Sequence, residues 1–314
     1  MANDGTRPDS PPPAGGENGG RLEKNQNQSG LWAAFSAFLL WGLLPVYWKA
    51  LDSIDSFELL CHRILWSFVC LVPFMLFSGR LAGLAVFLRN PGHFFGLVFS
   101  GFLLAANWYL YICAINSGMI LEASLGYYIN PLVSIVFGVV IFREKAGFLA
   151  WLGISAAVVG VAFQVVKLGH LPWVPLGLAC SFAVYGLMRK LMQIQALPGL
   201  FMETLVVVPF AAGYLLWKSQ TSGAPFLPGD PATQVLLVGA GVITTIPLLC
   251  FAFGARRIRM TSLGILQYVN PTCSFLLGVF VYKENITADG LITFFCIWIG
   301  LALYTYETTR KHSW

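Results

Sequence analysis

Polar and ionisable side chains inside long apolar stretches are the residues of this sequence that could do chemistry. A charge near the centre of a bilayer costs about 2.5 to 3.5 kcal/mol on insertion scales, so a retained charge usually serves a function. Glu122, Gly126 and Asn130 follow i, i+4, i+8 spacing, which places an acid, a gap and an amide on one face of a helix. This pattern predicts a cavity-facing proton or cation site. The alternative is that Glu122 lies near the outer end of its helix and simply faces water.

A second cluster of ionisable residues lies around position 62. Glu58 and His62 are one helical turn apart, and Arg63 follows directly. Because imidazole titrates near neutrality, His62 could relay protons, while Arg63 could hold an anionic substrate. The alternative, which we favour, is an internal ion pair of Arg63 with Glu58 or Glu122 that fixes helix positions. Glu58 and its counterpart Glu203 are expected to lie at interfacial helix starts.

Two prolines, Pro131 and Pro271, each follow an asparagine. Each proline lacks the N–H group that would bond the carbonyl four residues earlier. A freed carbonyl at membrane depth needs a partner or a wet cavity, so we predict two interrupted helices that line a path. The alternative is an ordinary kink that serves helix packing.

Asn107 and its counterpart Pro247, another break within a span, are further candidates for a cavity role. The complete predicted path consists of His62, Arg63, Asn107, Glu122, Tyr127, Asn130, Pro131, Pro247, Gln267, Asn270 and Pro271. Aromatic residues of the apolar runs more often mark interfaces or lipid contacts than a binding cage, although some could line a cavity. These aromatic residues are Trp32, Trp41, Trp48, Trp108, Tyr109 and Tyr111.

Enzymatic motifs are missing from the sequence. It contains no H-E-x-x-H, no G-x-S-x-G, no Walker loop and no aspartate well inside an apolar run, so the groups needed for zinc, serine or aspartyl hydrolysis are lacking. The seven cysteines are scattered and never form C-x-x-C, which argues against a disulfide framework or metal site. We therefore expect no enzyme activity, no cofactor and no metal.

The composition identifies the elements that must position these residues. Of 314 residues, 57% are hydrophobic and only 11% are charged, whereas a soluble domain carries about 25% charged residues. The chain is therefore predicted to be an all-α membrane protein. Its net charge of +5 reflects topology and not nucleic-acid binding, because most basic residues stand between the apolar runs.

Ten apolar runs are long enough to be transmembrane helices. Most Lys and Arg residues fall on the side of the amino terminus, so the positive-inside rule predicts that both termini are cytoplasmic. Residues 1–30 are rich in Gly, Pro and Asn and are predicted to be a disordered tail. Residues 309–314 are expected to form a short cytoplasmic tail. The predicted spans are 31–50, 57–78, 93–115, 119–142, 146–167, 172–190, 199–217, 233–255, 260–282 and 287–306.

The sequence repeats itself at an offset of 140 residues. YINPLVSIVFGVVIFRE at 128–144 aligns without a gap to YVNPTCSFLLGVFVYKE at 268–284. The predicted repeats, 31–167 and 172–308, hold five spans each, and an odd number of spans forces the two copies into opposite orientations. Inverted repeats are the usual architecture of secondary transporters, with the substrate site near the midplane.

Several motifs occur in the order found in a known family. LEASLGYYINPLVSIVFGVVIFRE, HRILWSF at 62–68, YGLMRK at 185–190, and TTIPLLCF with LGILQYVNPT resemble the RarD-type branch of the EamA transporters, in the drug/metabolite transporter superfamily. The resemblance covers about residues 31–308. It implies a ten-helix permease of the bacterial inner membrane, with inverted five-helix halves around a central cavity, that moves small metabolites or drugs, commonly outward.

The sequence thus predicts alternating-access transport of a small organic solute, with proton coupling through Glu122 or His62 as one form of it. The expected partners are a small-molecule substrate and the lipid bilayer, without nucleic acid, and the protein is expected to be a monomer or homodimer. A channel or sensor without active transport is the alternative, followed by a membrane-embedded enzyme.

Overall fold

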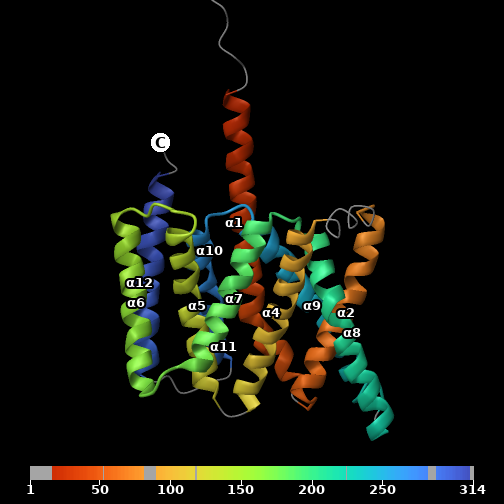
Figure 1. Cartoon of the computed structure of the whole chain (residues 1–314). Helices are drawn as coiled ribbons and strands as arrows, with labels where there is room; N and C mark the ends of the chain where they lie inside the picture. The colour runs from red at the N-terminus through yellow and green to blue at the C-terminus, as the bar shows by residue number, and fades with distance from the viewer. Residues whose placement is uncertain are drawn as a thin grey trace, which may run out of the picture.

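The computed structural model describes residues 16–51, 53–80, 90–116, 119–223, 225–281 and 288–311, and these residues form helices joined by short connections. Within these ranges, side chains are described except at 16–24, 112, 115–116, 120–124, 168, 278, 288–290 and 308–311. Figure 1 shows the helices side by side in one bundle. Their bounds are α1 Gly16–Lys49, α2 Ser56–Phe77, α4 Pro91–Asn116, α5 Ile120–Val140, α6 Phe148–Leu168, α7 Trp173–Met192, α8 Ala196–Ser222, α9 Pro231–Ala255, α10 Met260–Gln267, α11 Val269–Phe280 and α12 Ala288–Lys311.

Local sequence signals set several helix ends. The Asp55 carboxylate accepts hydrogen bonds from the backbone N–H groups of Phe57 and Glu58 and so caps α2. Asp230 caps α9 in the same way, and Pro231 occupies the first position of that helix. At its carboxyl end, α6 stops at Gly169, whose φ of 76° is a left-handed conformation that glycine adopts without steric cost.

The described helices correspond to the predicted spans in order, with α10 and α11 together forming the ninth. By length and composition, six of the described helical segments are long and apolar enough to cross a membrane. These segments are Asn25–Lys49, Ser56–Phe77, Pro91–Tyr111, Phe148–Lys167, Ala196–Ser222 and Pro231–Ala255.

The amino-terminal tail differs from the prediction. Helix α1 begins at Gly16 and runs without a break into the first span, although residues 1–30 were expected to lack structure. A helix that is already formed extends at little cost, because each added residue gains one hydrogen bond. Gly30 also lies against the side chains of Arg257 and Ile258, so the helix contacts the bundle before the first apolar run begins. At the other end, α12 continues to Lys311.

Pairs of helices from the two halves of the chain form the bundle. Helix α2 packs on α8 and α9, α1 packs on α9, α4 packs on α7, and α6 packs on α12. In Figure 1, α6 and α12 form one edge of the molecule, and α2 and α8 lie at the opposite edge. Gly153 of α6 and Gly300 of α12 let their backbones touch, because a Cβ built on either glycine lies 2.5 to 2.6 Å from the carbonyl oxygen of the other.

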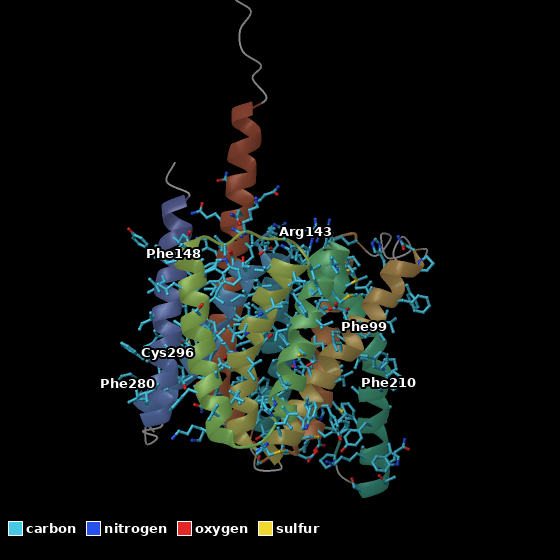
Figure 2. All side chains as sticks on the ribbon, turned by 60° about the vertical axis from the view of Figure 1, so that its left-hand side comes forward. Phe99, Arg143, Phe148, Phe210, Phe280 and Cys296 are labelled. Carbon is cyan, nitrogen blue, oxygen red and sulfur yellow. The ribbon has the colours of Figure 1, made fainter. Side chains whose placement is uncertain are left out.

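The outside of the bundle is apolar and aromatic. Figure 2 shows Phe99, Phe148, Phe210 and Phe280 on the surface of the helices, where 52% to 79% of each residue is exposed. A surface of this kind suits a lipid environment and would be unfavourable in water. Arg143 lies at the end of the bundle at which the amino-terminal part of α1 and the carboxyl-terminal end of α12 are found (Figures 1 and 2). We call this end of the bundle the chain-end side.

Candidate functional site

A cavity lies inside the bundle, in the half away from the chain-end side. About 1040 Å³ of space within it is not filled by protein atoms, and this figure includes open solvent. The lining reaches Trp48, in the last turn of α1, and Tyr111, near the end of α4, so the cavity extends toward the end of the bundle opposite the chain-end side. Its lining comes from α1, α2, α4, α5, α7, α10 and α11, and comprises Phe38, Trp41, Leu44, Pro45, Trp48, Arg63, Asn107, Trp108, Tyr111, Gly126, Tyr127, Asn130, Leu178, Phe182, Gln267, Asn270 and Ser274.

Arg63 is the charged residue of this lining. Its guanidinium carbon lies 4.5 Å from the ring centroid of Trp48 and 4.8 Å from that of Trp108, so two indole rings hold the cation. Its Nε donates a hydrogen bond of 3.3 Å to the hydroxyl of Thr244 on α9. Helices α1, α4 and α9 therefore fix the position of one side chain on α2.

Amide groups form much of the polar wall. The Nδ2 of Asn107 donates to the Leu178 carbonyl at 2.9 Å and to the Ser181 hydroxyl at 2.8 Å, which joins α4 to α7. The Gln267 amide lies 3.1 Å from the hydroxyl of Ser134 and joins α10 to α5. Asn130 is buried, and its Oδ1 has no hydrogen-bond partner within the part of the chain that the structure describes.

Aromatic rings close the inner end of the cavity. Trp41 of α1 and Phe182 of α7 meet edge to face with ring centroids 5.6 Å apart. Behind them, Tyr185 stacks on Phe251 of α9 at 5.8 Å, and Phe38 packs against the same Phe251 at 5.9 Å. This cluster separates the cavity from the chain-end side. We call these five residues the aromatic plug.

A buried ion pair lies beyond the plug. Arg189 of α7 and Glu203 of α8 are 3.2 Å apart with exposed side-chain fractions of 0% and 1%. Ser100 of α4 donates a 2.7 Å hydrogen bond to the same carboxylate, and Tyr185 of the plug donates another at 3.2 Å. Gly199 leaves room for the guanidinium, since a Cβ there would collide with it. The network joins three helices and closes the chain-end side.

Six of the predicted path residues come together in the cavity, namely Arg63, Asn107, Tyr127, Asn130, Gln267 and Asn270. The Glu122 side chain falls outside the described residues, and its backbone lies in the first turn of α5, one turn before Gly126 of the lining. His62 is fully buried away from the lining, against the ring of Phe226 at 5.6 Å. Neither His62 ring nitrogen has a hydrogen-bond partner within the described residues.

The prolines do not form the predicted symmetric pair of interruptions. Helix α5 continues through Pro131, and α9 continues through Pro247, because a helix can absorb one missing hydrogen bond as a kink. The ninth span is interrupted at Tyr268, and Pro271 then lies in the first turn of α11, where a backbone N–H has no intrahelical partner in any case. Pro131, Pro247 and Pro271 are not part of the cavity lining.

The predicted ion pair between Arg63 and Glu58 is wrong. Glu58 instead pairs with Lys218 of α8, with Nζ and Oε2 2.8 Å apart. Glu58 does lie in the first turn of α2, as expected, but Glu203 is deep inside the bundle and is not at a helix start. The sequence spacing identified these carboxylates but could not identify partners that come from other helices.

The sequence left open which of the six named aromatic residues line the cavity, and it did not name Phe38 or Phe182. Trp41, Trp48, Trp108 and Tyr111 line the cavity, whereas Trp32 and Tyr109 are exposed on the surface. The one sequence signal that could have selected Trp108 is its position next to Asn107. Trp48 carries no such signal, because only the tertiary structure, in which α1 and α2 both pack on α9, brings it to Arg63.

Comparisons with known proteins agree with this architecture. The model of the EamA-like transporter family matches the chain twice, over residues 28–166 and 172–306. Protein RarD of Escherichia coli is 39% identical over 93% of this chain and 100% of its own length. An uncharacterized transporter of Vibrio cholerae is 39% identical over 91% of this chain and 94% of its own length.

A more distant sequence relative and one solved structure are also similar to the chain. A protein of Pseudomonas aeruginosa called chloramphenicol-sensitive protein RarD is 27% identical over 90% of this chain and 95% of its own length. One solved crystal structure superposes with a TM-score of 0.68 at 20% identity, covering 88% of this chain and 98% of the other. At that identity the likeness is one of fold.

Proposed function

Since the chain belongs to the EamA-like transporter family, and within it to the RarD-type branch, we propose that it is a secondary-active permease that moves a small organic solute by alternating access. Membership of this family makes the chain a multi-pass membrane transporter. The proposal adds the mechanism, the class of solute, a location in the bacterial inner membrane and cytoplasmic chain ends.

The cavity is the observation that carries the proposal. It extends toward one end of the bundle, and the aromatic plug and the Arg189–Glu203 pair lie between it and the other end. An alternating-access transporter must hold its site open to one face at a time. With the chain ends in the cytoplasm, this arrangement is an outward-facing state. A channel would instead need a path continuous from one face to the other.

We further propose that the two halves are inverted repeats, 31–167 and 172–308. The two family matches nearly coincide with these ranges. The packing of α6 on α12 supports the same division, because Gly153 touches Gly300 while Gly160 touches Thr293. Position 153 moved by 140 becomes 293, and position 300 moved back by 140 becomes 160, so the first contact is converted into the second. Such an exchange is what a two-fold relation between the halves requires.

Proton coupling through His62 or Glu122 is the finer part of the proposal. Buried His62 has Glu58 one turn before it on α2, and Glu58 is paired with Lys218 of α8, so both charges lie near the imidazole. Transport by the His62→Ala variant, the Glu122→Gln variant and the double variant should be compared across pH. Loss of the pH dependence in one of them identifies the coupling group, and an unchanged pH dependence in the double variant would reject both residues.

Trans-stimulated exchange tests transport itself. The purified protein is reconstituted in liposomes loaded with unlabelled chloramphenicol, a probe chosen from the relative's name, and labelled chloramphenicol is added outside. We expect uptake of the labelled solute to exceed that of protein-free liposomes. Uptake should also be faster into loaded than into unloaded vesicles, because internal solute carries the transporter back to its outward-facing state. Uptake that is independent of internal solute would indicate a channel and contradict alternating access.

A further inference from the structure

We infer that the cavity binds an organic monoanion, with a carboxylate on Arg63 and a flat apolar or aromatic body against Trp41 and Phe182. The inference rests on the proposed transport function and assigns its class of substrate. Four features of the cavity carry it. Arg63 has no carboxylate partner among the described residues, and its terminal donors are free. The rest of the described lining is uncharged, and the inner end is aromatic.

The first feature is that Arg63 has no carboxylate partner within the described residues. The Glu122 side chain is not among the described ones, and the described carboxylates that could compete have partners elsewhere. Glu58 pairs with Lys218, and Glu203 pairs with Arg189. Glu144 accepts hydrogen bonds from the first two backbone N–H groups of α10. A guanidinium inside a membrane protein that faces a cavity and has no counter-ion among the described residues is a candidate site for an anion that enters the cavity.

The second feature is the direction in which Arg63 can still donate. Thr244 takes the Nε–H group, and the indoles of Trp48 and Trp108 lie against the guanidinium. Arg63 lines the cavity, and its two terminal NH₂ groups make no hydrogen bond with the described residues. Two parallel N–H donors match the two oxygens of a carboxylate, and such bidentate pairs are shorter and stronger than neutral hydrogen bonds.

The charge of the ligand follows from the rest of the lining. Apart from Arg63, the described lining residues are amides, phenols, a hydroxyl and apolar groups, all without formal charge. A monoanion neutralises the single cation, whereas a dianion would leave one buried negative charge without a partner, and a cation would be repelled by Arg63. The site is therefore built for one negative charge.

The shape of the ligand follows from the inner end of the cavity. Trp41, Phe182 and Phe38 present ring surfaces there. Because aromatic rings favour contact with other rings and flat apolar groups, burial of a planar body at this end is favourable.

A matched naphthyl series tests the assignment by titration calorimetry on the full chain in nanodiscs. The four probes are 1-naphthylacetate, its neutral amide, 1-naphthylmethylammonium and 1-naphthyl phosphate. We expect 1-naphthylacetate to bind at least about tenfold more tightly than the amide, and the ammonium and the phosphate to bind more weakly than the acetate. Equal binding of acid and amide, or tighter binding of the dianionic phosphate, would overturn the assignment.

Variants of Arg63 locate the preference. Arg63→Met should abolish the difference between acid and amide, and Arg63→Lys should keep part of it, because lysine retains the charge without the fork. The matched control is Arg143→Met, which removes an exposed arginine at the chain-end side and should leave the preference unchanged. A preference that survives Arg63→Met would exclude Arg63 as its source. If Arg63→Met does not fold, the wild-type series and Arg63→Lys still decide the question.

Exchange assays with the same probes separate this inference from the proposed function. Binding of 1-naphthylacetate without exchange across the liposome membrane would contradict transport and leave the anion site intact. Trans-stimulated exchange of the acid and the amide at equal rates would support transport and contradict the anion site.

Discussion

The hydroxyl of Tyr268 donates a hydrogen bond of 3.3 Å to the backbone carbonyl of Tyr128, and these two tyrosines stand 140 positions apart in the motifs YINP and YVNP. The contact ties the interrupted ninth span to α5. Tyr268 is also the residue at which α10 ends and α11 begins. The break in the ninth span is thus held from the equivalent position of the other half.

Removal of this hydrogen bond should destabilise the protein modestly. Tyr268→Phe is expected to cost about 0.5 to 1.5 kcal/mol, the net value of one intramolecular hydrogen bond. Tyr128→Phe is the matched control, because the contact uses the carbonyl of Tyr128 and not its hydroxyl. Melting temperatures in detergent compare the two variants, and an equal or larger loss for Tyr128→Phe would contradict the assigned hydrogen bond.

Replacement of one partner of the buried Arg189–Glu203 pair should lower the stability of the protein strongly. Arg189→Met leaves the Glu203 carboxylate buried without its cation, and removal of one partner of such a pair typically costs about 3 to 5 kcal/mol. The double variant Arg189→Met with Glu203→Gln removes both charges and should recover part of that loss. Thermal melting in detergent measures both, and a double variant no more stable than the single one would count against charge burial as the cause.

Substitution of Gly153 should separate α6 from α12. In Gly153→Leu the new side chain would start 2.6 Å from the carbonyl oxygen of Gly300, so the helices must move apart, at a cost of about 1 to 3 kcal/mol. Gly213→Leu on α8 is the matched control, since a Cβ there meets nothing within 4 Å. Size-exclusion chromatography and thermal melting should show a loss for the first variant alone. Similar behaviour of both variants would mean that leucine itself, and not the contact, is responsible.

The proposed orientation, with both chain ends in the cytoplasm, predicts which end of the bundle is accessible from outside the cell. In a background with the seven native cysteines replaced by serine, Gln220→Cys on α8 should react with an impermeant maleimide in intact cells. Lys145→Cys, in the connection between α5 and α6 on the chain-end side, should react only after permeabilisation. Both positions are exposed, so each serves as the control for the other. The opposite labelling pattern would place the chain ends outside.

The amino-acid order alone was sufficient for the class of protein, the order of the spans, the internal repeat and the family. These properties depend on the transfer of apolar segments into lipid and on local sequence patterns, neither of which requires knowledge of the neighbouring helix. Six polar residues that the sequence singled out also line the cavity, because a polar side chain inside an apolar run has few acceptable positions.

The tertiary structure alone decided which residues are partners. Glu58 meets Lys218, 160 positions away, and not Arg63, and Trp48 and Trp108 face Arg63 and not lipid. It also decided that His62 is buried outside the cavity lining while its neighbour Arg63 lies within it. Such choices depend on how far each helix is rotated about its own axis, and that rotation is set by the packing of remote segments against one another.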